Sequence, residues 1–81
     1  MKALIVGAGK LGAKLAESMV AEDMDVTVMD NNSNKIDRLN EQIDCLTIVA
    51  NGIDIKILKE IGIESYDYLI ACTDNDDTNT L

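Results

Sequence analysis

Residues 2–12, KALIVGAGKLG, decide the fold of this 81-residue chain. The short apolar run Lys2–Val6 ends at a glycine, which is typical of a strand buried on both faces. The run is followed directly by G-x-G-x-x-G, in which each glycine has its own role. Gly7 permits a tight turn, Gly9 lets a pyrophosphate approach the backbone, and Gly12 lets the next helix pack closely on the strand. The stretch therefore predicts a strand, a phosphate-binding turn and a helix.

Strands and helices alternate along the rest of the chain. The apolar residues Leu11, Leu15 and Met19 recur every fourth position and predict a helix with one face on a sheet. Further elements follow from β-branched runs and helix caps: strands at residues 25–29, 45–49 and 68–72, a helix capped by Ser33, and a short helix capped by Asp54 and ended by Gly62. Because the connections are too long for hairpins, the pattern predicts an α/β fold with a Rossmann-like parallel sheet and right-handed crossovers.

An acidic residue strengthens the nucleotide interpretation. Asp30 lies 18 residues after Gly12, at the end of the second predicted strand, where such folds place a carboxylate on the adenosine ribose. That carboxylate would repel a 2′-phosphate, and the next residue is Asn31 rather than arginine. The expected ligand is therefore NAD or NADH, or another adenine nucleotide, with NADP disfavoured. The alternative is that the glycines only form a turn and that Asp30 only begins a loop.

Three further polar positions have two interpretations each. Lys10 either reaches a phosphate or is a solvated lysine at a helix start. Thr73 and Asp74 follow the last strand at the carboxyl edge of the sheet, where α/β proteins bind ligands, and one of them can also cap a fourth helix. The acids at 74, 76 and 77 do not form a calcium loop, because the sixth position is Asn79 instead of glycine. We expect no metal site.

Composition excludes several classes of function. The net charge is −8, and residues 60–81 contain six acids and no base, so binding to nucleic acid or to an anionic membrane is not expected. No apolar run is long enough for direct membrane insertion or for a signal-peptide core. The two cysteines show no metal-binding or disulfide spacing, and the sequence has no histidine. No acid–base pair or activated nucleophile is visible, so we expect no catalytic residues and a cytoplasmic protein.

Four stretches together resemble the N-terminal nucleotide-binding domain of TrkA-type regulators of potassium transport, the KTN or RCK domain. They are GAGKLGAKLAESM at 7–19, VMDNN at 28–32, ILKEIGI at 57–63 and LIACTDNDDTN at 69–79. The first two are shared with many dehydrogenases, whereas the last two are more particular to this family.

The resemblance implies a set of binding residues. Gly7, Ala8, Gly9, Lys10 and Leu11 would hold the pyrophosphate, Asp30 with its neighbour Asn31 the adenosine ribose, and Thr73 with Asp74 the second half of the ligand. Asn51 and Gly52 fall near the adenine, where the family usually has an acid that is often followed by alanine. An asparagine can accept and donate hydrogen bonds, so the base preference stays open.

The resemblance also implies a longer fold. The family's domain has six strands, whereas this chain stops at Leu81, just after the fourth. We therefore expect residues 1–81 to form a partial dinucleotide-binding domain of the KTN/RCK type, with strand order 3-2-1-4 and without the last two strands. Its fourth strand would lie at an unprotected edge, which favours a homo-oligomer.

The function implied is that of a non-catalytic regulator. It would sense an adenine nucleotide and control a membrane potassium transporter subunit, and only that contact would hold it at the inner face of the membrane. The alternative is the cofactor-binding fragment of an NAD-dependent dehydrogenase. The type of domain that follows Leu81 in the parent reading frame would distinguish the two.

Overall fold

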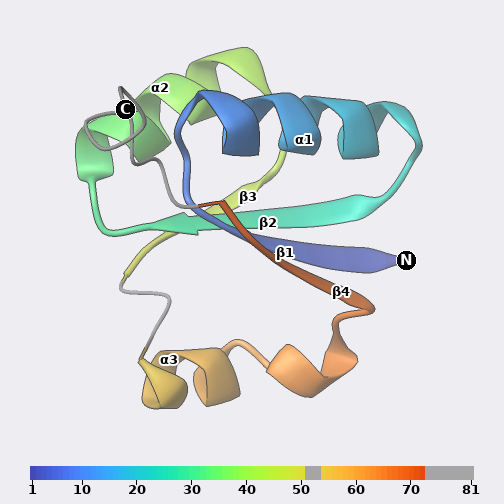
Figure 1. Ribbon diagram of the computed structural model, residues 1–81, viewed down its shortest axis with the longest axis vertical. Helices are drawn as coiled ribbons and strands as arrows, with labels where there is room; N and C mark the ends of the chain where they lie inside the picture. Colours follow the sequence, from blue (N-terminus) through green and yellow to red (C-terminus); the bar gives the residue numbers. More distant parts are fainter. Residues whose placement is uncertain (51–53, 73–81) are drawn as a thin grey trace, which may run out of the picture.

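The computed structural model describes residues 1–50 and 54–72, which form one parallel sheet with helices on both faces (Figure 1). The elements in chain order are β1 (Lys2–Val6), α1 (Lys10–Ala21), β2 (Asp25–Asp30), α2 (Ser33–Gln42), β3 (Leu46–Val49), α3 (Ile55–Glu60), the 3-10 helix η1 (Ile63–Ser65) and β4 (Tyr68–Ala71). The strand order is β3-β2-β1-β4, and every pairing is parallel. This confirms the predicted Rossmann-like α/β fold and the order 3-2-1-4.

The main core lies between the sheet and the two longer helices. Helices α1 and α2 cover one face of the sheet (Figure 1), and Ile5 of β1 and Val28 of β2 are paired in register beneath them. Ala16 of α1 and Leu39 of α2 are buried against these strands. Residues 3–5 of β1 have no exposed surface, which confirms that the first strand is buried on both faces.

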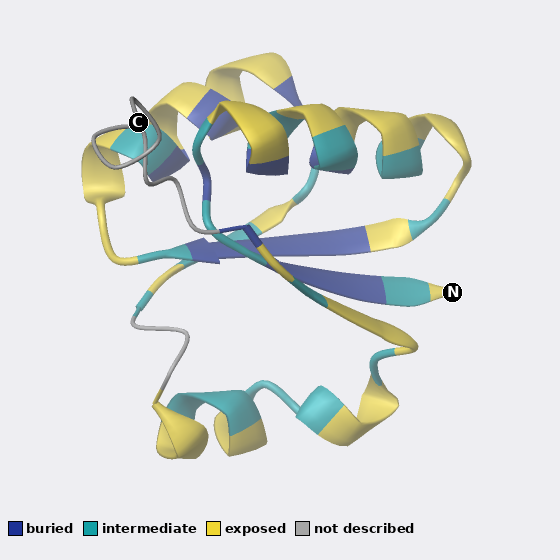
Figure 2. Cartoon of the chain, viewed as in Figure 1, coloured by how far each residue is buried: buried dark blue, intermediate teal, exposed yellow. Residues whose placement is uncertain are grey.

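Within residues 1–50 and 54–72, the opposite face of the sheet is covered only at its centre. Four residues on this face are neighbours across the sheet, in the order Leu46 (β3), Thr27 (β2), Leu4 (β1) and Leu69 (β4). Leu4 and Thr27 are buried, whereas Leu69 and Leu46 are 58% and 62% exposed. The hydroxyls of Thr27 and Tyr66, the residue after η1, form a 2.8 Å hydrogen bond on this face. No residue of α3 is buried (Figure 2). The two outer strands therefore expose apolar side chains.

The cap of α2 is not the residue that the sequence predicted. Asn32, with extended backbone, accepts hydrogen bonds at Oδ1 from the amides of Asn34 (2.9 Å) and Lys35 (3.3 Å), so it is the N-cap. Ser33 is already the first helical residue. The prediction was wrong because both residue types are good caps, and the end of the preceding strand decides between them.

The apolar stripe of α1 differs from the prediction only at its first residue, because Leu15 and Met19 pack against the core as predicted. Leu11 is 63% exposed, and the buried residues of the helix are Gly12 and Ala16. The close approach of Gly12 to the sheet turns Leu11 outward. The strand ends shift by one residue: Asp30 belongs to β2, Cys45 precedes β3, and Cys72 follows β4 while remaining buried.

Candidate functional site

The glycine loop between β1 and α1 is packed too tightly for side chains at two positions. Gly7 has φ +118°, and a Cβ there would overlap the backbone carbonyl of Cys72. A Cβ on Gly12 would overlap the carbonyl oxygen of Gly7. This confirms the roles of Gly7 in the turn and of Gly12 in close helix–strand packing.

The N-terminus of α1 has no side-chain cap. Its N-cap is Gly9, and the first helical bond runs from the amide of Ala13 to the Gly9 carbonyl at 2.9 Å. The amides of Lys10, Leu11 and Gly12 precede that bond and have no partner within the helix. Among the α-helices in residues 1–50 and 54–72, only α1 is uncapped, because Asn32 caps α2 and Asp54 caps α3. In the part of the chain that the structure describes, this end of α1 therefore offers N–H groups with no partner in the helix and the positive end of a helix dipole, which together suit an anion.

Asp30 connects the glycine loop to the turn after β2. Its Oδ2 accepts a hydrogen bond from the Ala8 amide and its Oδ1 one from the Asn32 amide, each at 2.8 Å. Each carboxylate oxygen keeps a further lone pair, so the group can still accept ribose hydroxyls. The bond to Asn32 is an Asx turn that the DNN sequence could have indicated. The bond to Ala8 joins residues 22 apart and follows only from the pairing of β1 with β2.

The other predicted site residues are distributed as follows. Lys10, Leu11 and Asn31 are exposed around the glycine loop and the β2–α2 turn. Asn51, Gly52, Thr73 and Asp74 lie outside the described residues, as does the acidic run that was considered for calcium.

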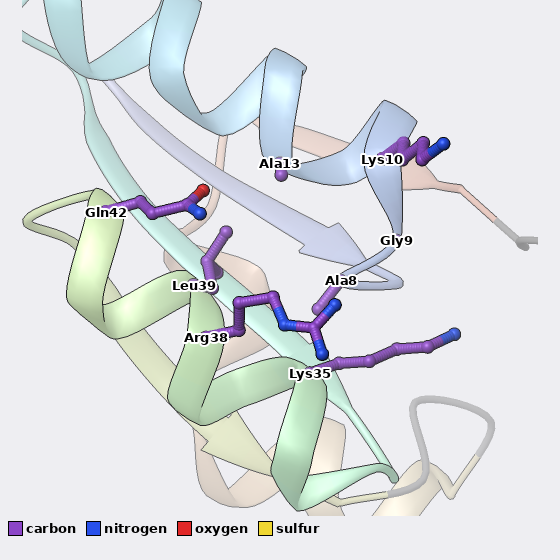
Figure 3. Close-up of a pocket in the computed structure, with 8 residues that line it drawn as sticks. All are labelled: Ala8, Gly9, Lys10, Ala13, Lys35, Arg38, Leu39 and Gln42. Carbon is purple, nitrogen blue, oxygen red and sulfur yellow. The ribbon is translucent and has the colours of Figure 1, made fainter.

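A groove of about 360 Å³ adjoins the glycine loop between the two longer helices (Figure 3). We call it the α1–α2 groove; its lining residues are Ala8, Gly9, Lys10 and Ala13 from the loop and α1, and Lys35, Arg38, Leu39 and Gln42 from α2. The lining contains three bases and no acid. Lys35 and Arg38 were missed as site residues, because periodicity in sequence does not show which faces of two helices meet.

The Cys72 thiol lies close to the glycine loop and is shielded from solvent. Cys72 is buried beside Gly7, and burial raises the pKa of its thiol, so the thiol stays protonated. In the described ranges, no cluster of three or more His, Cys, Asp and Glu residues could hold a metal ion. Within the same ranges, no helix has the length and apolarity that a membrane span requires.

Comparison with known proteins gives a consistent result. Residues 3–81 match the TrkA-N domain family. The chain is 37% identical over 79 residues to the Trk system potassium uptake protein TrkA of Vibrio alginolyticus, covering 98% of this chain and 17% of that protein. It is 36% identical over 81 residues to a TrkA homolog of Methanothermobacter thermautotrophicus, covering 100% of this chain and 38% of that protein.

A solved structure shares the fold. The TrkA-N domain of the inner membrane protein ybaL from Escherichia coli superposes with a TM-score of 0.78 at 26% identity, covering 96% of this chain and 57% of that one. The chain thus spans less than two thirds of the length of each of these proteins.

Proposed function

The chain belongs to the TrkA-N domain family, and we propose that it is a regulatory module that binds an adenine nucleotide and controls a potassium transport system. The relatives' names, Trk system potassium uptake proteins, support the link to potassium transport. In this proposal, residues 1–81 are part of a KTN/RCK-type dinucleotide-binding domain. The ligand is NAD or NADH, with ATP, ADP or AMP as alternatives.

One observation carries the proposal: the uncapped N-terminus of α1 lies next to the Asp30 carboxylate, with the Ala8 amide bonded to that carboxylate. Phosphates of the ligand would accept hydrogen bonds from the amides of residues 10–12. Ribose hydroxyls would donate to the free lone pairs of Asp30. The hydrogen-bonding groups of the site match those of a nucleotide, because the loop supplies donors for an anion and the strand end supplies acceptors for hydroxyls.

The proposed binding residues fall into two groups, which differ in the observations that support them. Residues 7–12 form the loop and the uncapped end of α1, Asp30 accepts a hydrogen bond from Ala8 in that loop, and Asn31 follows Asp30 in the turn after β2. Asn51, Gly52, Thr73 and Asp74 are proposed on the family resemblance alone. Asp30 would also discriminate against NADP, because its carboxylate would face the 2′ position of a bound ribose and would repel a phosphate there.

The role we propose is regulatory and not catalytic. The sequence has no histidine, and the relatives' names describe potassium uptake. Control of a transporter requires that the nucleotide bind one conformation of the regulator more tightly than another. The partner would be a membrane potassium transporter subunit, and contact with that subunit would bring the protein to the inner face of the membrane.

Amide chemical shifts during a titration with NAD would test the proposed site. We expect the amides of Lys10, Leu11 and Gly12 to shift, because a phosphate would accept their hydrogens. The amide of Lys56 on α3, across the sheet from the glycine loop, provides an internal control, since the Asp54 side chain already caps it. Saturable shifts at residues 10–12 would support the proposal. Shifts confined to other residues, or none, would overturn it.

A further inference from the structure

The free edge of β4 lacks the features that usually protect an outer strand. Among the described residues, β4 pairs only with β1. The amide of Cys72 donates to the Val6 carbonyl at 2.7 Å, and in a parallel ladder every second residue of a strand bonds to the same neighbour. The backbone N–H and C=O groups of Leu69 and Ala71 therefore point away from β1. The strand sequence, YLIA, contains no charge and no proline that would block another strand.

The side chains of β4 are also accessible to a partner. Leu69 is 58% exposed, and most of the strand is exposed in Figure 2. A strand added at this edge would form backbone hydrogen bonds with Leu69 and Ala71 and would pack a side chain against Leu69. Extended peptides bind to exposed sheet edges in this way, with affinity from the backbone and specificity from the side chains.

The charges next to this edge are negative. Residues 60–72 contain no base and three exposed acids, which are Glu60, Glu64 and Asp67. Lys2 of β1 also lies at the start of β4, but its ammonium donates to the Ser65 hydroxyl at 3.1 Å and lies over the Tyr66 ring. At low ionic strength the acids would attract a basic segment and repel a second copy of this chain.

The other free edge, that of β3, has different surroundings. Residues 33–49 contain two bases and three acids, so their charges nearly balance. The side chains of Asn40 in α2 and Thr47 in β3 also bond to each other, at 2.9 and 3.2 Å. A basic partner would therefore favour the edge of β4 over the edge of β3.

We propose that the free edge of β4 is a docking site for an extended, basic segment of another protein, which adds a fifth strand to the sheet. Backbone hydrogen bonds with Leu69 and Ala71 hold the segment, and lysine or arginine side chains at its end face Glu64 and Asp67. The inference does not depend on nucleotide binding at the glycine loop.

Fluorescence anisotropy of a labelled peptide, KKVTVTVKK, at low ionic strength tests this site. Two control peptides separate the contributions. EEVTVTVEE keeps the strand and reverses the charge, whereas KKVPPTVKK keeps the charge but cannot pair as a strand. We expect saturable binding of KKVTVTVKK alone, weakening as salt is added, which is opposite to the salt dependence of self-association. No binding, equal binding of KKVPPTVKK, or an affinity that rises with salt would overturn the proposal.

Two proline variants of the chain locate the edge that binds the peptide. Ala71→Pro removes an outward N–H from the last residue of β4. Val49→Pro is the matched control at the last residue of β3, because the Ala50 amide donates to the Asp30 carbonyl and the alternation directs the Val49 amide outward. We expect Ala71→Pro to weaken peptide binding about tenfold or more, and Val49→Pro to leave it unchanged. Equal effects of the two variants would contradict the assignment to β4.

A charge variant keeps the test decisive if circular dichroism shows that Ala71→Pro does not fold. Glu64→Gln removes one exposed acid beside β4, and Glu41→Gln removes an exposed acid from α2 as its control. Glu64→Gln should weaken peptide binding severalfold and reduce its salt dependence, whereas Glu41→Gln should change neither. Identical affinities of the two glutamine variants would overturn the proposal.

Discussion

Asp30 has a structural and a proposed binding role at the same position. Its two oxygens hold the amides of Ala8 and Asn32, so the carboxylate fixes the glycine loop against the turn that starts α2. The ribose role was predicted from spacing alone, 18 residues after Gly12. The spacing could not predict the bond to Ala8, because that bond depends on the register of β1 against β2.

We expect Asp30→Ala to weaken adenine-nucleotide binding about ten- to over a hundredfold, since charge-assisted hydrogen bonds contribute about 1.5–3 kcal/mol. The variant should fold with a lower free energy of unfolding, because two amides lose their acceptor. Asp37→Ala, which removes an exposed acid from α2, is the control for net charge. Calorimetry at a temperature where circular dichroism shows both variants folded measures the effect. An unchanged dissociation constant for Asp30→Ala would exclude the ribose role.

Gly12→Ala tests the packing of α1 on β1. Alanine is favoured over glycine in a helix by about 1 kcal/mol, so propensity alone predicts stabilisation. The added Cβ would overlap the Gly7 carbonyl, which is backbone and cannot rotate away. We therefore expect a net destabilisation of about 1–3 kcal/mol, measured by denaturant unfolding. A more stable variant would show that the loop and the helix can separate at little cost.

At the scale of elements, the strands and helices follow the sequence pattern closely, and the errors lie at their ends. All four strands were predicted to within one residue at each end, because short apolar runs closed by glycine or polar residues leave little choice. The cap of α2 was wrong because Asn32 and Ser33 are adjacent and chemically similar. The α1–α2 groove was missed because it requires knowing how two helices are turned relative to each other.

The cap assignment gives a prediction with a built-in control. Asn32→Ala should destabilise the chain by about 1 kcal/mol, since Asn32 is the acceptor for two amides at the start of α2. Ser33→Ala should have almost no effect, because Ser33 is within the helix. Thermal unfolding of both variants separates the possibilities. A larger loss of stability in Ser33→Ala than in Asn32→Ala would show that Ser33 is the N-cap of α2.

In the molecule as a whole, the two outer strands, β3 and β4, have free edges and exposed apolar side chains. Among the described residues, β3 and β4 each pair with one strand only, and Leu46 and Leu69 are exposed on the same face of the sheet. Sequence reasoning anticipated the open edge at β4. Exposed strand edges and apolar patches are typical interfaces.

We expect the 81-residue chain to self-associate, and more strongly as salt is added, because the six acids of residues 60–81 repel their copies at low ionic strength. Sedimentation velocity at several salt concentrations measures this. Leu69→Lys should shift the equilibrium toward monomer, since it places a charge on the exposed face of β4. A wild-type chain that stays monomeric at high salt would show that the edge strands need no partner.

We propose that this chain binds an adenine nucleotide through the glycine loop and Asp30. The most direct test is calorimetric titration of the purified chain with NAD, NADH, NADP, ATP, ADP and AMP under identical conditions. We predict saturable binding of at least one nucleotide with an unphosphorylated ribose, and much weaker binding of NADP than of NAD. Absence of binding across the set would contradict the nucleotide proposal, and equal affinity for NAD and NADP would contradict the assignment of Asp30 to the ribose.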